Sequence, residues 1–471
     1  KTSVGRAVAA RLGWAFLDMD VEIEARAGKT ISEMFEQEGE ATFRRMEADL
    51  CREVSAWQGM VVATGGGALV NPLFGAGNRR RLMASGPVIC LSCGADEIVR
   101  RLAAAQDRPL LDVDDRRTEV EALLERRREG YAAIPRQIDT TGLSVDEVVE
   151  AVLAAARSIL LPVRHPGGQY PIHIAPGLLG QLGPLVRETL GVETVAVVTN
   201  PTVAQRYLEP VLASLERAGI RPIFCTMPDG EAHKTLETLA GLYDQFVTGE
   251  LDRSGAVLAL GGGVTCDVAG FAAATYMRGL PVVQAPTTLL AMVDASVGGK
   301  TAVDLPQGKN LVGAFKQPVL VVIDPGVLET LPPPEVASGM AELIKHGVLA
   351  DPELFVELAI GPPEPSAWPS WVARSLQVKI EVVEEDPYER GRRAVLNLGH
   401  TAGHALEQLS GYRMRHGEVV SIGMVIAARI AVEMGLAEAR LPDRIAAVLA
   451  AHGLPVTCPS FDVNAIWEAM G

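Results

Sequence analysis

The sequence predicts an α/β protein with two parallel sheets flanked by helices, followed by a helical region. Short β-rich runs alternate with longer helical stretches, as they do in β-α-β units. The runs are 15–17, 61–64, 88–91, 195–199, 223–226, 256–260, 282–285 and 319–323. At 471 residues the chain exceeds the size of one hydrophobic core, which rarely grows beyond about 250–300 residues. We therefore expect more than one domain.

A segment rich in proline and glycine separates the first three runs from the rest. It begins at Leu161 and follows an alanine-rich stretch that predicts a helix over 145–159. From about Pro334 onward the strand pattern fades and helical periodicity dominates. The predicted organisation is a first domain at 1–160, a linker at 161–169, an α/β domain at 170–330 and a helical domain at 331–471.

Composition limits the classes of partner. Lys and Arg number 43 against 58 Asp and Glu, a net charge of −15, and no basic run is dense enough to follow a phosphate backbone. We expect small-molecule substrates, no nucleic acid, no membrane segment and a cytoplasmic location. Six cysteines are scattered along the chain, and Cys90-x-x-Cys93 lacks a second pair for zinc. We interpret that pair as the end of a buried strand.

Three histidines in the helical region predict a metal site. His400 and His404 are four residues apart, so a helix places them on one face, and His416 can return after the turn near Ser410. Zn²⁺ prefers imidazoles with one carboxylate and leaves a position for substrate. Glu342 is a candidate carboxylate, because it lies on an apolar helix where an unpaired charge is costly. The alternative is a set of core histidines with hydrogen-bond partners.

A glycine triplet, 261–263, directly follows the strand predicted at 256–260 and precedes a helix that contains Asp267. Glycines at such a turn let backbone N–H groups approach a pyrophosphate at the positive end of a helix. The spacing is not that of the usual dinucleotide fingerprint, and a simple tight turn is the alternative. Thr199 and Asn200 end another strand and can line the same nucleotide crevice.

Cationic residues gather in the second half of this acidic chain. Most of them stand beside glycine or apolar residues rather than in charged runs, which predicts a substrate that carries both phosphate and carboxylate. The set is Arg278, Lys300, Lys309, Lys345, Lys379 and Arg393, with Asn310 beside Lys309.

These motifs together resemble 3-dehydroquinate synthase from about Tyr170 to the end of the chain. The resemblance rests on Gly261-Gly-Gly-Val-Thr-Cys-Asp267, the run from Pro286 to Thr301, Gly308-Lys-Asn310 and Leu396-Asn-Leu-Gly-His-Thr-x-Gly-His404. It implies a Rossmann-like NAD-binding domain, a helical metal-binding domain and a homodimer.

The resemblance also implies residue roles. Glu342, His400 and His416 would hold the metal, Zn²⁺ or Co²⁺, and His404 would lie near the substrate phosphate. The substrate contacts would be Asp294, Lys300, Asn310, Lys345, Lys379, Glu389, Arg393 and Asn397, with Arg278 from a second subunit. NAD would contact Asn200, Glu231, Lys234, Gly262, Gly263, Asp267, Thr287, Thr288 and Lys309.

The implied reaction converts 3-deoxy-D-arabino-heptulosonate 7-phosphate to 3-dehydroquinate and phosphate, and NAD is regenerated in each turnover. A metal-dependent polyol or alcohol dehydrogenase is the alternative, but net hydride transfer does not require so many cationic side chains. A scaffolding protein of enzyme ancestry is the alternative outside catalysis.

The first half resembles shikimate kinase over about 1–157. The chain opens with Lys1-Thr2-Ser3, which is typical of the end of a Walker A loop, followed by Asp18-Met-Asp20, Phe43-Arg44-Arg45-Met-Glu47 and the glycines 65–67. The resemblance implies a P-loop kinase fold using ATP and Mg²⁺. Lys1 and Ser3 would contact ATP, Thr2 would bind Mg²⁺, and Arg108 would meet the transferred phosphoryl group. Shikimate would contact Asp20, Arg44, Gly65, Gly66, Gly67 and Arg136.

Both ends of the chain carry expectations. Because the chain begins at Lys1 without methionine, we expect Walker A glycines upstream and little kinase activity without them. We also expect a lysine-rich segment after Gly471. Another small-metabolite kinase, such as a gluconate kinase, is the alternative for the first half.

Overall fold

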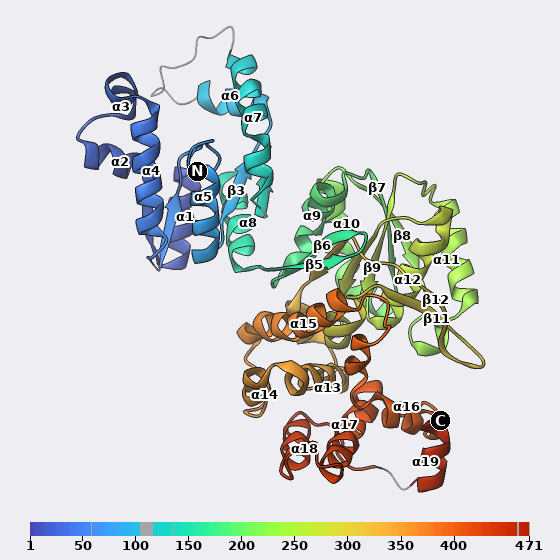
Figure 1. Cartoon of the computed structure of the whole chain (residues 1–471). Helices are drawn as coiled ribbons and strands as arrows, with labels where there is room; N and C mark the ends of the chain where they lie inside the picture. Colours follow the sequence, from blue (N-terminus) through green and yellow to red (C-terminus); the bar gives the residue numbers. More distant parts are fainter. Residues whose placement is uncertain (58, 104–115, 135, 459–460, 471) are drawn as a thin grey trace. The chain divides into compact units, whose positions relative to one another are not determined.

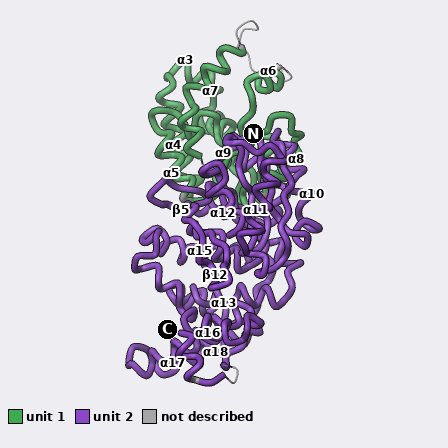
Figure 2. Tube along the Cα trace, turned by 90° about the vertical axis from the view of Figure 1, so that its right-hand side faces the viewer, with its two compact units in different colours: residues 1–157 green, residues 158–471 purple. Residues whose placement is uncertain are grey.

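A computed structural model describes residues 1–471 except 58, 104–115, 135, 459–460 and 471. The chain forms two compact units, Lys1–Arg157 and Ser158–Gly471 (Figure 2). Among the described residues, no helix combines the length and the apolar character needed to span a bilayer.

The first unit is α/β, as predicted. Strand β1 (Ala15–Asp18) pairs in parallel with β2 (Met60–Ala63), and β3 (Ile89–Ser92) pairs in parallel with β4 (Arg136–Asp139). A core that includes Met19, Ile23, Met34 and Phe43 packs on these strands. The helices are α1 (Thr2–Leu12), α2 (Met19–Ala27), α3 (Ile31–Glu38), α4 (Glu40–Val54), α5 (Gly75–Ser85), α6 (Ala95–Ala103), α7 (Arg116–Ala132) and α8 (Val145–Arg157).

The second unit is built on a seven-stranded sheet in the order β5-β6-β13-β10-β9-β7-β8. Figure 1 labels β5 to β9 of this sheet. All neighbours pair in parallel except β5 and β6. Its central strands are buried on both faces, so they are nearly continuous runs of Val, Ala, Leu and Ile. The strands are β5 (Ile159–His165), β6 (Gly168–Ile174), β7 (Thr194–Thr199), β8 (Arg221–Thr226), β9 (Ala256–Gly261), β10 (Val282–Pro286) and β13 (Leu320–Ile323).

The linker predicted at 161–169 is wrong. These residues belong to β5 and β6, which form an antiparallel hairpin at the edge of the sheet, with Pro162 opposite Pro171. Proline is tolerated on an edge strand, and glycine suits the tight turn at Gly167 and Gly168. The proline and glycine signals therefore mark a hairpin turn, and the chain divides earlier, after Arg157.

A second hairpin, β11 (Lys300–Leu305) and β12 (Gly308–Phe315), was not predicted and packs on α12 (Gly263–Thr275). The other helices of the sheet domain include α9 (Leu182–Leu190), α10 (Pro201–Arg217) and α11 (Leu236–Thr248). The last third is helical, as predicted. It comprises α13 (Pro333–Ala350), α14 (Pro352–Leu358), α15 (Trp368–Glu385), α16 (His400–Leu409), α17 (His416–Glu433), α18 (Leu441–Ala451) and α19 (Val463–Met470).

Candidate active site

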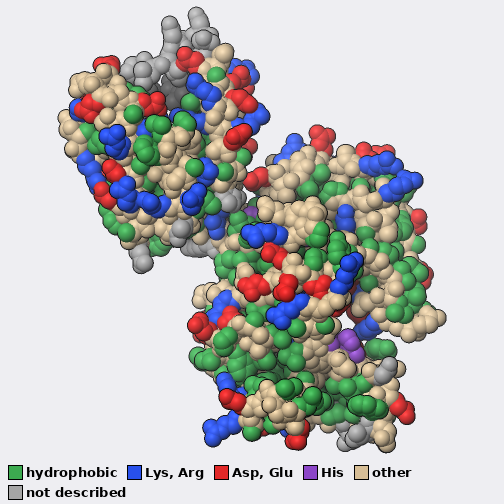
Figure 3. Space-filling view, in the orientation of Figure 1, with side chains coloured by type: hydrophobic (Ala, Val, Ile, Leu, Met, Phe, Trp, Pro, Cys, Tyr) green, Lys and Arg blue, Asp and Glu red, His purple; other side chains and the backbone are tan. Residues whose placement is uncertain are grey.

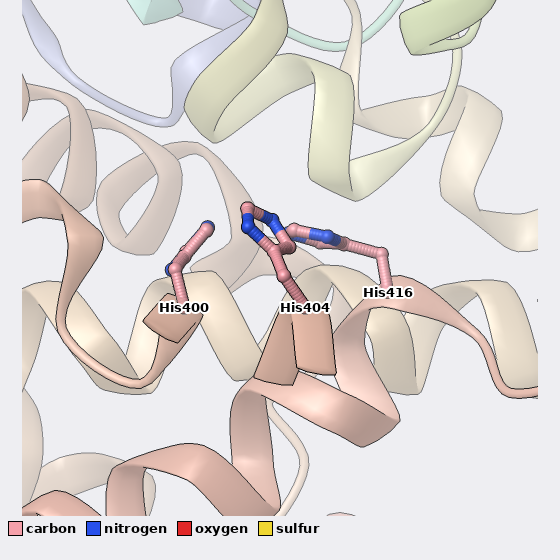
Figure 4. A group of neighbouring side chains, drawn as sticks. All are labelled: His400, His404 and His416. Carbon is pink, nitrogen blue, oxygen red and sulfur yellow. The ribbon is translucent and has the colours of Figure 1, made fainter. Parts of the chain in front are cut away.

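Three histidines and one glutamate converge where α16 and α17 begin. One ring nitrogen from each of His400, His404 and His416 lies within 4.8 Å of the other two (Figure 4). Oε1 of Glu342, on α13, lies 3.1 Å from Nε2 of His416 and 3.6 Å from Nε2 of His400. Imidazole nitrogens with one carboxylate oxygen are donors that Zn²⁺ prefers. The group therefore fits a divalent metal.

Close helix packing brings these donors together. The amide of Gly417 donates to Oγ of Ser338 at 3.0 Å, and a Cβ atom at Gly417 would collide with the backbone of Ser338. The start of α17 therefore lies directly on α13. Gly423 of α17 packs against the carbonyl of Gly399, which precedes α16 in a left-handed conformation with φ +83°. The three helices can approach this closely because glycine has no side chain.

The electrostatics of the cluster suit metal binding. Burial disfavours ionised Glu342, but Lys345, His416 and His400 outweigh burial and hold the pKa of the carboxyl group well below its usual range. Burial also opposes the charged form of His416, yet its hydrogen bond to the Glu342 carboxylate raises its pKa. Burial lowers the pKa of His400 to about 4. An anionic carboxylate and a neutral imidazole are thus available at neutral pH, as a metal requires.

Three of the predicted cationic residues are buried beside this cluster. Nζ of Lys345 donates to the carbonyl of Leu396 at 2.6 Å, and the ammonium also contacts Glu342. Nζ of Lys379 donates to the Asp294 carboxylate at 2.6 Å. Only 2% of Arg393 is exposed. Three buried cationic side chains in one compact unit favour a site that receives an anion.

Glu389 connects further predicted residues. Its Oε2 lies 2.5 Å from Nζ of Lys300, and its Oε1 accepts from Nδ2 of Asn397 at 3.4 Å. The Arg393 guanidinium donates to the carbonyl of Gly298 at 3.1 Å, in the turn just before Lys300. The segment that contains Glu389, Arg393 and Asn397 therefore contacts the turn that leads into β11.

The predicted nucleotide crevice lies at the carboxyl ends of neighbouring strands. Strand β9 runs into α12 through Gly262 and Gly263, and the N-cap residue Gly262 has no side chain that could cap the helix. A Cβ atom at Gly262 would lie 3.1 Å from Cγ2 of Thr288, so glycine keeps this space open. Asn200 follows β7 as the N-cap of α10, and Thr287 follows β10. The open helix terminus fits the pyrophosphate of a dinucleotide.

A buried lysine extends the crevice toward the β11–β12 hairpin. Nζ of Lys234 donates to Oδ2 of Asp267 at 2.6 Å and to Oδ1 of Asn310 at 2.5 Å. Asn310 has φ +57°, and its amide donates to the Asp304 carboxylate at 2.7 Å. Burial raises the pKa of Asp267 to about 6, although Lys234 opposes that effect.

Lys309 lies between two carboxylates and joins the hairpin to α16. Its Nζ lies 2.9 Å from Oε1 of Glu407 and 3.4 Å from Oε1 of Glu231. The family resemblance implies a role for Glu231 but not for Glu407, which lies one helical turn after His404. That spacing was the available signal, because residues three apart share a helix face.

In the first unit, the predicted shikimate residues lie together. A Cβ atom at Gly65 would be 2.7 Å from Oδ1 of Asp20, and one at Gly67 would be 2.7 Å from Nη1 of Arg44. Arg44 pairs with the buried Glu47 at 2.6 Å. The sequence motif at 43–47 contains Glu47 but does not indicate this contact.

The first helix supplies the predicted ATP and Mg²⁺ residues. Nζ of Lys1 donates to the carbonyl of Thr64 at 2.9 Å, and Oγ1 of Thr2 donates to Asp18 at 2.6 Å. Ser3 is exposed beside them in α1. Arg108, predicted to meet the phosphoryl group, lies outside the described residues.

A different arginine from the predicted Arg136 faces the glycine turn. Nη1 of Arg127 donates to the carbonyl of Gly66 at 3.0 Å, and the hydroxyl of Tyr131 donates to the same oxygen at 2.7 Å. Arg136 instead begins β4, where it pairs with Ile89. The missed signal is the spacing of Arg127 and Tyr131, which places both on one face of α7.

The face of the second unit drawn in Figure 3 carries imidazole groups at its surface. His404 is exposed, whereas His400 and His416 are partly buried. The group of histidine donors is therefore open to solvent on the side of His404. Arg278 is also exposed, with φ +72°, and among the described residues no hydrogen bond or ion pair joins it to the other site residues.

Both units match known protein families. Residues 1–157 match the shikimate kinase family. Residues 224–338 match the N-terminal part of 3-dehydroquinate synthase, and residues 339–471 match its C-terminal part.

Individual relatives cover the second unit. A 3-dehydroquinate synthase of Symbiobacterium thermophilum is 52% identical over 298 residues, 62% of this chain and 83% of that protein. One from Nostoc punctiforme is 48% identical over 320 residues, 66% of this chain and 88% of that protein.

Two solved structures share the fold of this unit. A 2-deoxy-scyllo-inosose synthase in complex with carbaglucose-6-phosphate, NAD⁺ and Co²⁺ is 26% identical with a TM-score of 0.61, covering 66% of this chain and 86% of that one. A 2-epi-5-epi-valiolone synthase of Streptomyces hygroscopicus subsp. jinggangensis with NAD⁺ and Zn²⁺ is 29% identical with a TM-score of 0.59, covering 64% and 85%.

Proposed function

This chain belongs to the 3-dehydroquinate synthase family and carries a shikimate kinase unit ahead of the synthase, and we propose from that premise how its residues work. The second unit converts 3-deoxy-D-arabino-heptulosonate 7-phosphate to 3-dehydroquinate and phosphate. The first unit transfers a phosphoryl group from ATP to shikimate. Both reactions belong to aromatic amino acid biosynthesis.

The second unit uses NAD and a divalent metal, Zn²⁺ or Co²⁺. When bound, NAD would supply a hydride acceptor that is regenerated in each turnover, and the metal would supply a Lewis acid that polarises a substrate hydroxyl. Glu342, His400 and His416 would hold the metal, because the carboxylate lies within 3.6 Å of both imidazole nitrogens. His404 is the exposed member of the cluster and would face the substrate.

The crevice at β9 and α12 would hold NAD. The open N-terminus of α12 at Gly262 and Gly263 would receive the pyrophosphate. Around it, Asp267 would keep Lys234 in place through their 2.6 Å ion pair. The surrounding contacts would come from Asn200, Glu231, Thr287, Thr288 and Lys309.

Buried cations would bind the acidic substrate. Lys345 and Lys379 would stabilise negative charge beside the metal donors, and Arg393 would fix a carboxylate or phosphate group. Lys300 and Asn397, both in contact with Glu389, would orient the substrate ring. Asn310 and Asp294 would be the remaining residues that contact the substrate.

One observation carries this function. A metal donor cluster that contains the anionic Glu342 contacts the buried ammonium of Lys345, and both lie in the same compact unit as the nucleotide crevice. A simple dehydrogenase needs the metal and the nucleotide, but it has no need of several buried cations. Elimination of phosphate from a substrate that also carries a carboxylate uses all three features.

In the first unit, ATP with Mg²⁺ would lie against Lys1, Thr2 and Ser3. Shikimate would lie among Asp20, Arg44 and the turn at 65–67. We propose Arg127 as the guanidinium that meets the shikimate carboxylate, because it contacts the carbonyl of Gly66 at 3.0 Å.

We also propose a homodimer in which Arg278 acts on the partner's substrate. In support, Arg278 is exposed and lies in a turn with two consecutive positive φ angles, Met277 at +48° and Arg278 at +72°. Mixing Arg278→Ala and His416→Ala variants should restore about a quarter of wild-type activity, since half of the dimers would be mixed and each would have one complete site. No recovery would mean that Arg278 acts within its own subunit.

The function is tested by incubating the chain with heptulosonate phosphate, NAD and Zn²⁺ and identifying the products by mass spectrometry. We expect 3-dehydroquinate and phosphate in equal amounts. A product that retains the phosphate group would refute the proposed elimination.

A further inference from the structure

We propose that Asp386 is a positioning residue of the synthase reaction, because its carboxylate shapes the 386–393 loop that presents Glu389 and Arg393. The inference rests on the proposed function of the second unit. It adds a residue that neither the sequence motifs nor the site chemistry had assigned.

The carboxylate of Asp386 accepts three backbone hydrogen bonds from its own loop. Oδ1 accepts from the amide of Arg390 at 2.8 Å, and Oδ2 accepts from the amides of Gly391 at 2.8 Å and Arg393 at 3.1 Å. The amide of Asp386 itself donates to the carbonyl of Val382 at 3.0 Å, so the residue also ends α15. A single side chain therefore fixes the path of the loop as it leaves the helix.

This path determines the position of Glu389. Glu389 has φ +56°, a conformation that non-glycine residues rarely adopt and that persists only when its surroundings enforce it. Asp386 holds the backbone immediately after it. In this conformation Glu389 reaches Lys300 at 2.5 Å and Asn397 at 3.4 Å. Loss of the loop hydrogen bonds should release both contacts.

The same loop fixes Arg393 at two points. Its amide is held by Asp386, and its guanidinium donates to the carbonyls of Gly298 at 3.1 Å and Pro387 at 2.9 Å. A Cβ atom at Gly298, which has φ +94°, would collide with the guanidinium. These contacts hold the arginine between the loop and the turn before β11.

Packing outside the loop supports the same geometry. The Tyr388 ring meets the Phe315 ring of β12 edge-on, with centroids 5.5 Å apart. The backbone hydrogen bonds, chiefly those from Arg390 and Arg393, lower the pKa of Asp386. Its lone pairs are therefore engaged within the loop, and Asp386 would act through Glu389 and Arg393 rather than on the substrate.

The test compares Asp386→Asn with a matched control, Asp324→Asn. Asp324 also accepts three backbone hydrogen bonds, from Gly177, Leu179 and Gly326, but these segments carry no predicted site residue. We expect Asp386→Asn to lower kcat/KM about ten- to hundredfold, mostly through KM, as misplaced binding groups do. Metal content and NAD affinity should stay unchanged. Asp324→Asn should reduce thermal stability at least as much and leave kcat/KM within about threefold.

An unchanged kcat/KM in Asp386→Asn, or equal losses in both variants, would overturn the proposal. Hydrogen exchange provides a readout independent of activity: the amides of Arg390, Gly391 and Arg393 should exchange faster in Asp386→Asn. Unchanged protection would overturn the positioning role even if the enzyme is a synthase. Absence of phosphate release by the wild-type chain would instead refute the proposed function.

Discussion

Oε1 of Glu342 lies 3.1 Å from Nε2 of His416, although 74 residues separate them in the sequence. The contact exists because Gly417 packs on Ser338, so the start of α17 rests on α13. The metal donors are thus assembled by helix packing and not by one continuous motif. One mutation can therefore remove a metal donor, and a different mutation can remove a substrate contact, with separate effects.

Replacing His416 by alanine should abolish metal retention after dialysis, because one imidazole and its hydrogen bond to Glu342 are removed. Lys300→Ala is the control. It should keep stoichiometric metal, measured by atomic emission, and lower kcat/KM about a hundredfold, the effect of losing a charged contact worth about 2–3 kcal/mol. Metal loss from the lysine variant would place the metal elsewhere.

Gly262→Ala should weaken NAD binding about tenfold or more, since the added Cβ atom would lie 3.1 Å from Thr288 at the helix terminus expected to receive the pyrophosphate. Isothermal titration with NAD measures the effect. Gly241→Ala in α11 is the matched control, because no atom lies within 4 Å of its added Cβ atom. Equal affinities of the two variants for NAD would argue against NAD binding at the crevice beside Gly262.

The ionisation of Asp267 should make stability depend on pH. Burial raises its folded-state pKa to about 6 from 3.8, so the folded protein binds this proton more tightly than the unfolded chain does. Its contribution is therefore fully present below about pH 4 and is lost as the pH rises to about 6. The rise of the pKa from 3.8 to about 6 corresponds to a loss of about 3 kcal/mol, which is an upper bound because 20% of the side chain is exposed to solvent.

Asp267→Asn should remove that dependence. Denaturant unfolding of both proteins between pH 4.5 and pH 7.5 measures the difference in the free energy of unfolding of the second unit. We expect wild type to lose stability relative to the variant up to about pH 6 and then to level off. A difference that does not change with pH would contradict the raised pKa.

In the first unit, Arg127→Lys should weaken shikimate binding about tenfold, because lysine cannot form the bidentate contact of a guanidinium with a carboxylate. Arg136→Lys should change it less than about threefold. Calorimetric titration of the full chain with shikimate distinguishes the two residues. A larger effect of Arg136→Lys than of Arg127→Lys on shikimate binding would instead favour Arg136 as the residue that contacts shikimate.

Local patterns were sufficient for some elements. The run 256–260 ends in glycines and leads into an apolar stretch, and the structure has β9, Gly262 and α12 there. The i,i+4 spacing of His400 and His404 placed both on one helix face. Such features depend on neighbours in sequence, so residue periodicity and turn chemistry predict them.

Long-range packing explains the failures. Pro162 and Gly167 were interpreted as linker residues because edge strands and linkers share the same residue types. The contact of Arg127 with the glycine turn, on which its proposed role rests, could not be predicted because only the fold brings α7 to that turn. The contacts of Asp386 could not be predicted because its partners are backbone amides, which every residue except proline carries.

The most direct test of the account is phosphate release from heptulosonate phosphate by the full chain. It should be measured after NAD is stripped, after chelation of the metal, and after each is restored. Release should require both, return when both are supplied, and proceed over many turnovers without net NADH, since the hydride returns to the substrate. Phosphate release that persists without NAD or metal, or NADH that accumulates with product, would contradict the mechanism.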